Sequence, residues 1–235
     1  MLFDLRGKGR RTAVKIIYSG LAILLGGGLV FFGIGSATGG GGLFDAFSSG
    51  SGDVSNVYTK QIEDYQKKVK AQPGNEDAWL ALTRAQVQSA SVVGYSEATQ
   101  TYDAKGRAEL EKASSSWKSY LELNPKKVNA QVAALMVNAY GPAGLNDPKA
   151  AAGALKEVVA SRKPSAALYA QLSVLLYQAG ETGQARLAEQ RALELAPADK
   201  RKLIRAQLAA QKAQIDAARK SQAQQQAQPT PGLGG

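Results

Sequence analysis

Residues 166–197 read AALYAQLSVLLYQAGETGQARLAEQRALELAP, and this stretch decides the fold. Apolar residues recur every three or four positions in both halves, which is the period of an amphipathic α-helix. Gly180 separates the two halves, and Pro197 follows the second half, where a proline prevents the helix from continuing. The stretch therefore predicts two helices that pack against each other and end at Pro197.

The same stretch resembles the tetratricopeptide repeat (TPR), a family of helical hairpins. Small residues at three of its positions let the two helices approach closely, and a proline ends the second helix. Glu189 departs from the family pattern, because an aromatic residue is usual there. The residues that match repeat positions 4, 7, 8, 11, 15, 20, 27 and 32 are Tyr169, Leu172, Ser173, Leu176, Gly180, Ala185, Ala192 and Pro197.

Two earlier segments resemble the repeat less closely. The first contains about 18 extra residues, as its two halves are spaced too widely for the repeat, and we expect both helices to lengthen around a loop at 94–97. The middle segment is degenerate and is interrupted by the loop GPAGLNDP. The first matches at Trp79, Leu82, Thr83, Ala113, Trp117, Tyr120 and Pro125, and the second at Val132, Leu135, Met136, Ala139, Ala151, Leu155, Val158 and Pro164.

An amphipathic helix from residue 54 precedes these repeats, and a helix from about 199 to 220 follows them. The outer face of the last helix is rich in Lys, Arg and Gln, which suits a terminal cap, and we expect Leu203, Ile204 and Leu208 to face inward. The sequence thus predicts an all-α, TPR-like α-solenoid of about three hairpins plus flanking helices over residues 54–220. Residues 221–235 are predicted to be a disordered tail.

A transmembrane helix is predicted at residues 16–34, IIYSGLAILLGGGLVFFGI, which are 19 residues without a charge. At about 1.5 Å per residue they would span about 28 Å, close to the thickness of a bilayer core. A cleaved signal peptide is the main alternative, because Gly35-Ser36-Ala37 is a small-x-small sequence. A buried core helix is the second alternative.

The charges flanking this span predict its orientation. Residues 1–15 form a basic tail with five basic residues and one acidic residue, whereas residues 35–59 contain no basic residue. The positive-inside rule places the N-terminus in the cytoplasm and the bulk of the chain outside, at the cell membrane. Residues 35–53 read as a flexible Gly/Ser-rich linker with a small apolar island at Leu43, Phe44 and Phe47.

Composition excludes several kinds of chemistry. The 235 residues include no Cys and no His, which removes thiol nucleophiles, imidazole bases and the usual zinc ligands. Most of the net charge of +10 lies in residues 1–15 and 199–220, so the domain between them is nearly neutral. We therefore expect no enzyme activity, no cofactor, no metal, no small-molecule substrate and no nucleic-acid partner.

The resemblance to TPR proteins implies that a protein or peptide partner binds the concave face made by the first helices of the repeats. The apolar members of this face have an alternative role in packing between neighbouring helices. The face consists of Leu80, Arg84, Val87, Gln88, Val174, Tyr177 and Gln178.

The architecture resembles bacterial single-pass TPR proteins and implies a membrane-anchored extracytoplasmic scaffold, accessory to secretion, envelope assembly or folding of exported proteins. Its contact with the lipid bilayer is through residues 16–34. One alternative is a stably docked, non-catalytic subunit of a membrane complex, as in cell division or cytochrome maturation. Another is a secreted TPR protein with a cleaved signal peptide.

Overall fold

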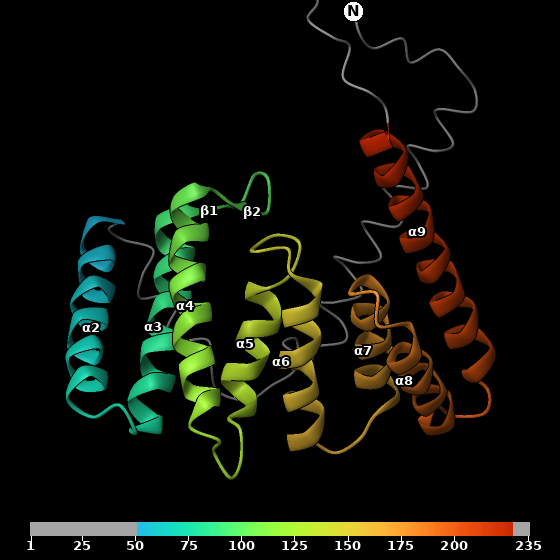
Figure 1. The fold of residues 1–235 in the computed structure, drawn as a ribbon, viewed down its shortest axis with the longest axis horizontal. Helices are drawn as coiled ribbons and strands as arrows, with labels where there is room; N and C mark the ends of the chain where they lie inside the picture. The colour runs from blue at the N-terminus through green and yellow to red at the C-terminus, as the bar shows by residue number, and fades with distance from the viewer. Residues whose placement is uncertain (1–50, 228–235) are drawn as a thin grey trace, which may run out of the picture. The chain divides into compact units, whose positions relative to one another are not determined.

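The computed structural model describes residues 51–227, and this part of the chain is all-α apart from one small β-hairpin. The predicted all-α class is confirmed for these residues. In Figure 1 the helices follow one another in chain order. The helices are α2 Ser51–Ala71, α3 Glu76–Gly94, α4 Ala104–Glu122, α5 Ala130–Ala139, α6 Pro148–Ser161, α7 Ala166–Gln178, α8 Thr182–Leu195 and α9 Arg201–Ala227, and the strands are β1 Tyr95–Ser96 and β2 Thr101–Tyr102.

The helices pack as an α-solenoid-like array of hairpins. Each of α3, α5 and α7 packs against the helix that follows it in sequence, so that α3/α4, α5/α6 and α7/α8 are the three hairpins. Contacts of α3 with α5 and of α6 with α7 join successive hairpins. Helix α2 packs on α3 at one end, and α9 packs on α7 and α8 at the other.

Side-chain caps fix where five of these helices begin. In each case a side-chain oxygen accepts a hydrogen bond from a backbone N–H of the first turn, which would otherwise lack a partner. The turn between α7 and α8 depends on Gly180, whose φ of +84° lies in the region that favours glycine. The capping residues are Asn75, Asp103, Asn129, Asp147 and Ser165.

The positions that the repeat pattern assigns to the hairpin interiors are mostly buried. Alanine fills several of these positions, where its small methyl group leaves room for a neighbouring helix. These fully buried alanines are Ala113, Ala151, Ala185 and Ala192. A separate small cluster of Val69, Ala78 and Leu82 holds α2 on α3.

The insertion in the first hairpin lengthens both helices, and α3 and α4 each contain 19 residues. The loop predicted at 94–97 is more ordered than expected, because Tyr95 pairs with Tyr102 in an antiparallel β-hairpin. Directly below this β-hairpin the backbones of α3 and α4 touch. A Cβ atom on Gly106 would lie 3.0 Å from the carbonyl carbon and oxygen of Gly94.

The ends of the domain differ from the predicted bounds. Helix α2 begins at Ser51, inside the predicted linker, and α9 continues to Ala227, beyond the predicted end at 220. The expectation that Leu203 faces inward is wrong, because its side chain is 59% exposed. Ile204 is half-buried and Leu208 is buried, as the helical period allows.

Three predicted segments lie outside the described residues: the basic tail at 1–15, the membrane span at 16–34 and the apolar island at 43–47. Among residues 51–227, no helix is both long enough and apolar enough to cross a bilayer. The membrane anchor therefore stays a prediction from the sequence.

Candidate partner-binding face and cleft

The seven residues predicted to bind a partner lie on two helices, α3 and α7. In the array the second hairpin lies between the hairpins to which these helices belong (Figure 1). The predicted residues therefore form two separate groups. Leu80, Arg84, Val87 and Gln88 lie on α3, and Val174, Tyr177 and Gln178 lie on α7.

Five of the seven side chains reach the surface. Arg84 and Gln88 are exposed, and Leu80, Val174 and Gln178 are half-buried. Val87 and Tyr177 instead belong to the main hydrophobic core, with 8% and 5% of their surface exposed. Packing between helices, the alternative reading of the apolar positions, accounts for these two residues.

Tyr177 is held from two sides. Its hydroxyl donates a hydrogen bond of 3.1 Å to Glu189 Oε2 on α8, and Lys212 Nζ of α9 lies 5.4 Å from the centre of its ring. Burial, followed by the bond to Glu189, raises the pKa of the Tyr177 hydroxyl above its usual value. Glu189, the one departure from the TPR pattern, thus has a structural partner.

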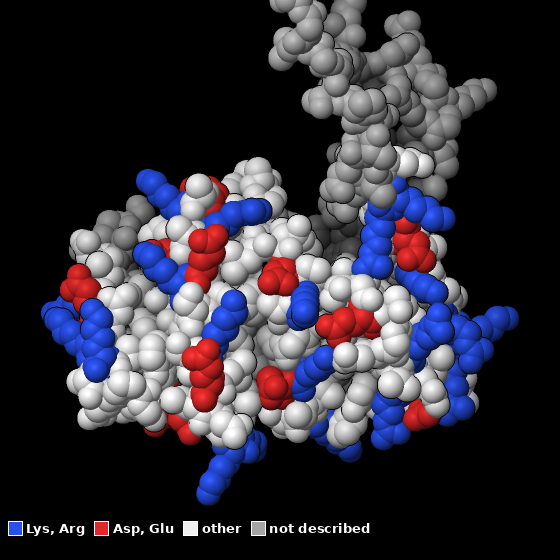
Figure 2. Space-filling model, in the orientation of Figure 1, with Lys and Arg blue, Asp and Glu red and all other residues white. Residues whose placement is uncertain are grey.

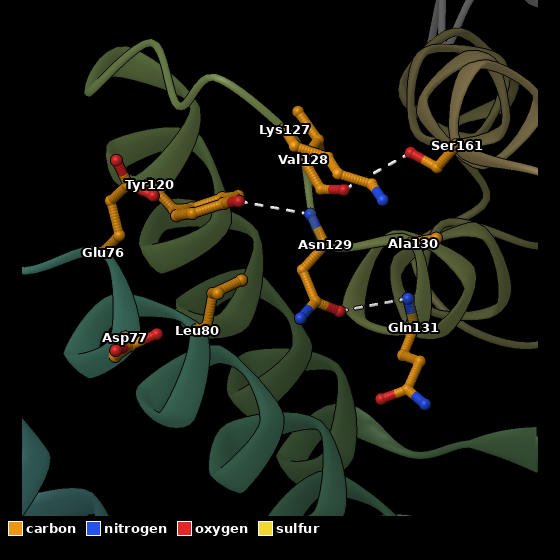
Figure 3. Close-up of a pocket in the computed structure, with 10 residues that line it drawn as sticks. All are labelled: Glu76, Asp77, Leu80, Tyr120, Lys127, Val128, Asn129, Ala130, Gln131 and Ser161. Atoms are coloured by element: carbon orange, nitrogen blue, oxygen red, sulfur yellow. Dashed lines mark hydrogen bonds between the residues drawn. The ribbon is translucent and has the colours of Figure 1, made fainter.

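Leu80 lines a cleft of about 400 Å³ at the N-terminal ends of α3 and α5 (Figure 3). The cleft draws its walls from the first turn of α3, the end of α4, the loop before α5 and the end of α6. It is lined by Glu76, Asp77, Leu80, Tyr120, Lys127, Val128, Asn129, Ala130, Gln131 and Ser161.

Hydrogen bonds between these elements hold the cleft in shape. The buried Tyr120 hydroxyl accepts a bond of 3.2 Å from the backbone N–H of Asn129, and Ser161 Oγ donates one of 3.3 Å to the Val128 carbonyl. Asn129 Oδ1 accepts bonds from the backbone N–H groups of Gln131 and Val132, and so caps α5 (Figure 3). Helices α4, α5 and α6 and the loop before α5 are therefore fixed around the cleft before any ligand binds.

Nearby carboxylates act on the hydroxyl of Tyr120, which lines the cleft. Burial raises the pKa of the Tyr120 hydroxyl most strongly, and the charges of Glu76, Glu157 and Asp77 raise it further, against the opposing effect of the Asn129 hydrogen bond. Within residues 51–227, neither Glu76 nor Asp77 forms an ion pair. Both carboxylates remain available to a cationic group on a partner.

The arrangement combines apolar and hydrogen-bonding surface in one concave place. Leu80 and Val128 offer half-buried apolar surface, and the Asn129 amide and the exposed Lys127 and Gln131 offer donors. Such a lining suits an extended peptide, whose backbone needs hydrogen bonds and whose side chains need pockets. Among residues 51–227, no group of three or more acidic side chains is placed to hold a metal ion.

Of the residues that line this cleft, the sequence predicted a binding role only for Leu80. Asn75 and Asn129 could have signalled it, because an Asn before a run of apolar residues marks the start of a helix. The cleft itself depends on how the starts of α3 and α5 pack in successive hairpins, which the local pattern does not specify. The chain matches no protein-family model, and a search of curated proteins finds no similar sequence.

Proposed function

We propose that this chain is a membrane-anchored scaffold that binds a segment of a partner protein on the outer side of the cell membrane. The observation that carries the binding role is the preformed cleft beside Leu80, with its mixed apolar, amide and acidic lining. The cleft lies at the first helices of two successive hairpins, where the resemblance to TPR proteins also implies the binding face.

The uncharged helices α5 and α7 also support the proposal. Helices α5 and α7 contain no charged residue, whereas their hairpin partners α6 and α8 contain several. Leu135, Gln171 and Val174 remain half-buried on these uncharged helices, so the array leaves their surface incompletely covered. An uncharged, partly covered face lets a partner bind without stripping water from ions, which would oppose association.

A photo-crosslinking amino acid at Gln131 tests the binding role in membranes of the native cell. Gln131 is an exposed residue of the cleft, and the matched control at Lys118 is exposed on α4 but does not line it. We expect a defined protein adduct from position 131 and none from position 118. A Leu80→Ser variant should weaken that adduct, and equal adducts from both positions would contradict the proposal.

The same experiment separates the scaffold from a stably docked subunit. A scaffold for transient clients should yield an adduct whose amount changes with the supply of exported proteins. A subunit of one complex should yield one adduct in constant ratio to the chain.

The anchor and its orientation rest on the uncharged span at 16–34 and on the basic residues that precede it. Protease added to intact spheroplasts should digest the helical domain, and the protein extracted from membranes should retain its N-terminus by mass spectrometry. Protection of the domain until lysis would reverse the orientation. A mature N-terminus at Thr38 would replace the anchor with a cleaved signal peptide.

A further inference from the structure

Four basic side chains lie at the beginning of α9 or immediately before it. Lys200, Arg201, Lys202 and Arg205 are all exposed, and none of them forms an ion pair within residues 51–227. Figure 2 shows basic side chains gathered over this helix at the right of the view. This group, the basic start of α9, outnumbers the one adjacent carboxylate, Asp199, and gives one end of the domain a local positive charge.

The fold explains only one of these four cations, because Arg201 Nε donates a hydrogen bond of 3.1 Å to the Ala196 carbonyl oxygen at the end of α8. The side chains of Lys200, Lys202 and Arg205 make no hydrogen bond or ion pair within residues 51–227. The N-terminus of a helix carries a partial positive charge from its peptide dipoles, so cations there oppose helix formation. Other cations of the same helix do stabilise the fold, because Lys212 lies over the Tyr177 ring and Arg219 binds carbonyl oxygens at the end of α7. A local arrangement that works against stability indicates a role outside folding.

One exposed leucine lies within the basic start of α9, and a second lies on α8. Leu203 is 59% exposed, and Leu187 on α8 is 69% exposed beside Arg186. These two are the most exposed of the large hydrophobic side chains described. Cations interspersed with exposed leucines are typical of helices that bind at the headgroup region of a bilayer.

We propose that the basic start of α9, together with Leu203, docks on anionic lipid headgroups of the membrane in which the chain is anchored. This inference rests on the anchor of the proposed function, since a tethered domain meets its own bilayer at high effective concentration. Nucleic acid or an acidic protein would neutralise the cations but would leave the side chain of Leu203 without an apolar environment. An anionic bilayer surface neutralises the cations and also offers the leucine an apolar environment.

A single fluorescent label tests the docking, because the chain contains no cysteine that would compete for it. The full chain with Ala206→Cys, an exposed position one turn beyond Lys202, is labelled with a polarity-sensitive dye and placed in lipid nanodiscs. One set of discs contains phosphatidylcholine alone, and the other contains phosphatidylcholine and phosphatidylglycerol. We expect the emission of the dye to shift to the blue only in the anionic discs. High salt should abolish this shift, because it screens the attraction between the cations and the headgroups.

Matched charge variants identify the residues responsible. The variant K200Q/R201Q/K202Q/R205Q should lose the blue shift, whereas K105Q/K118Q/R162Q/K163Q, which removes four exposed cations elsewhere, should keep it. Leu203→Ser should reduce the shift with every cation still present. Circular dichroism melts of all three variants verify that the helices persist, and the Leu203→Ser result decides the matter if the first variant does not fold.

The outcomes distinguish this inference from the proposed function. A chain that stays in both kinds of disc with identical emission would overturn the docking and leave the anchor intact. A chain that enters neither kind of disc would overturn both. A shift produced by added DNA or polyaspartate, without any response to phosphatidylglycerol, would assign the patch to a different anionic partner and overturn the docking on lipid.

Discussion

Arg219 of α9 reaches back 42 residues to the end of α7, where its guanidinium donates a hydrogen bond of 2.6 Å to the carbonyl oxygen of Tyr177. A second bond of 3.2 Å goes to the carbonyl oxygen of Gln178. The last carbonyl groups of a helix lack intrahelical partners and carry a partial negative charge, so a cation there is stabilising. One side chain of the terminal helix thus caps the C-terminal end of α7 in the third hairpin.

We expect Arg219→Gln to lower the free energy of unfolding by about 1–2 kcal/mol, because the change removes a charged donor from a partly buried helix end. Thermal denaturation followed by circular dichroism measures the effect. Lys220→Gln is the matched control, since Lys220 is exposed and makes no hydrogen bond or ion pair within residues 51–227. Equal melting temperatures for the two variants would show that the contact does not stabilise the domain.

The close contact of α3 with α4 makes a second prediction. A methyl group on Gly94 would overlap the Asp103 carboxylate and the backbone nitrogen of Gly106. Because these groups include backbone and the α4 cap, we expect Gly94→Ala to cost about 1–3 kcal/mol. The melting temperature of the purified domain reports this loss.

Gly153→Ala provides the contrasting control. Gly153 is exposed within α6, and a Cβ atom there would meet nothing within 4 Å. The alanine should therefore stabilise α6 by about 0.5–1 kcal/mol through its better helix propensity. If both alanines raised the melting temperature, the tight approach of α3 to α4 would be disproved.

The third hairpin could be predicted from sequence because its signals are local. Tyr169, Ala185 and Pro197 lie within one repeat, and spacing alone assigns them to the two helices and to the end of the second. The β-hairpin at 95–102 could not be predicted, because its strands are two residues each and are too short for a pattern of alternation to be recognised. Its order comes from tertiary contacts, including a hydrogen bond from the Tyr102 N–H to the Ala143 carbonyl.

The candidate site was less predictable than the fold. The repeat register places Leu80 and Tyr177 on the same kind of face, but Leu80 lines a cleft, whereas Tyr177 is buried with Lys212 against its ring. That burial depends on how α9 packs across α7, which spacing within a repeat does not encode. The cleft itself needs residues as distant as Glu76 and Ser161.

Buried tyrosines predict how stability responds to alkaline pH. Burial raises the pKa of Tyr120, Tyr140 and Tyr177 above 10, the value expected in the unfolded chain. At a pH between the pKa in the unfolded chain and the higher pKa in the folded chain, the folded state retains protons that the unfolded state has lost. The contribution of these tyrosines to the free energy of unfolding is therefore intact below about pH 10 and falls as the pH rises further.

Chemical denaturation at a series of pH values should therefore show a level unfolding free energy near neutrality and a decline above about pH 10. Tyr140→Phe should make the decline shallower, although it also removes the hydrogen bond of 2.8 Å between Tyr140 and Ser114. The slope rather than the absolute stability is the readout. An identical slope in parent and variant would exclude Tyr140 from the alkaline response.

The terminal helix as a whole makes the last prediction. Leu208 is buried, Ile215 packs against the main core, and Arg219 caps α7, so three turns of α9 contribute to the third hairpin. Deleting residues 199–235 removes all three contacts and exposes apolar surface on α7 and α8. Burying one leucine alone is worth about 1.5–3 kcal/mol, so the truncated domain should melt well below the parent or aggregate.

Deleting residues 221–235 is the control, because the described contacts that hold α9 on the hairpin all precede Ser221. Its melting temperature should equal that of the parent. In a repeat array an end unit needs a polar outer cover over its apolar side, so the longer deletion should lower stability by more than Arg219→Gln does alone. A domain that lacks residues 199–235 yet stays monomeric and melts like the parent would mean that α9 does not cap the array.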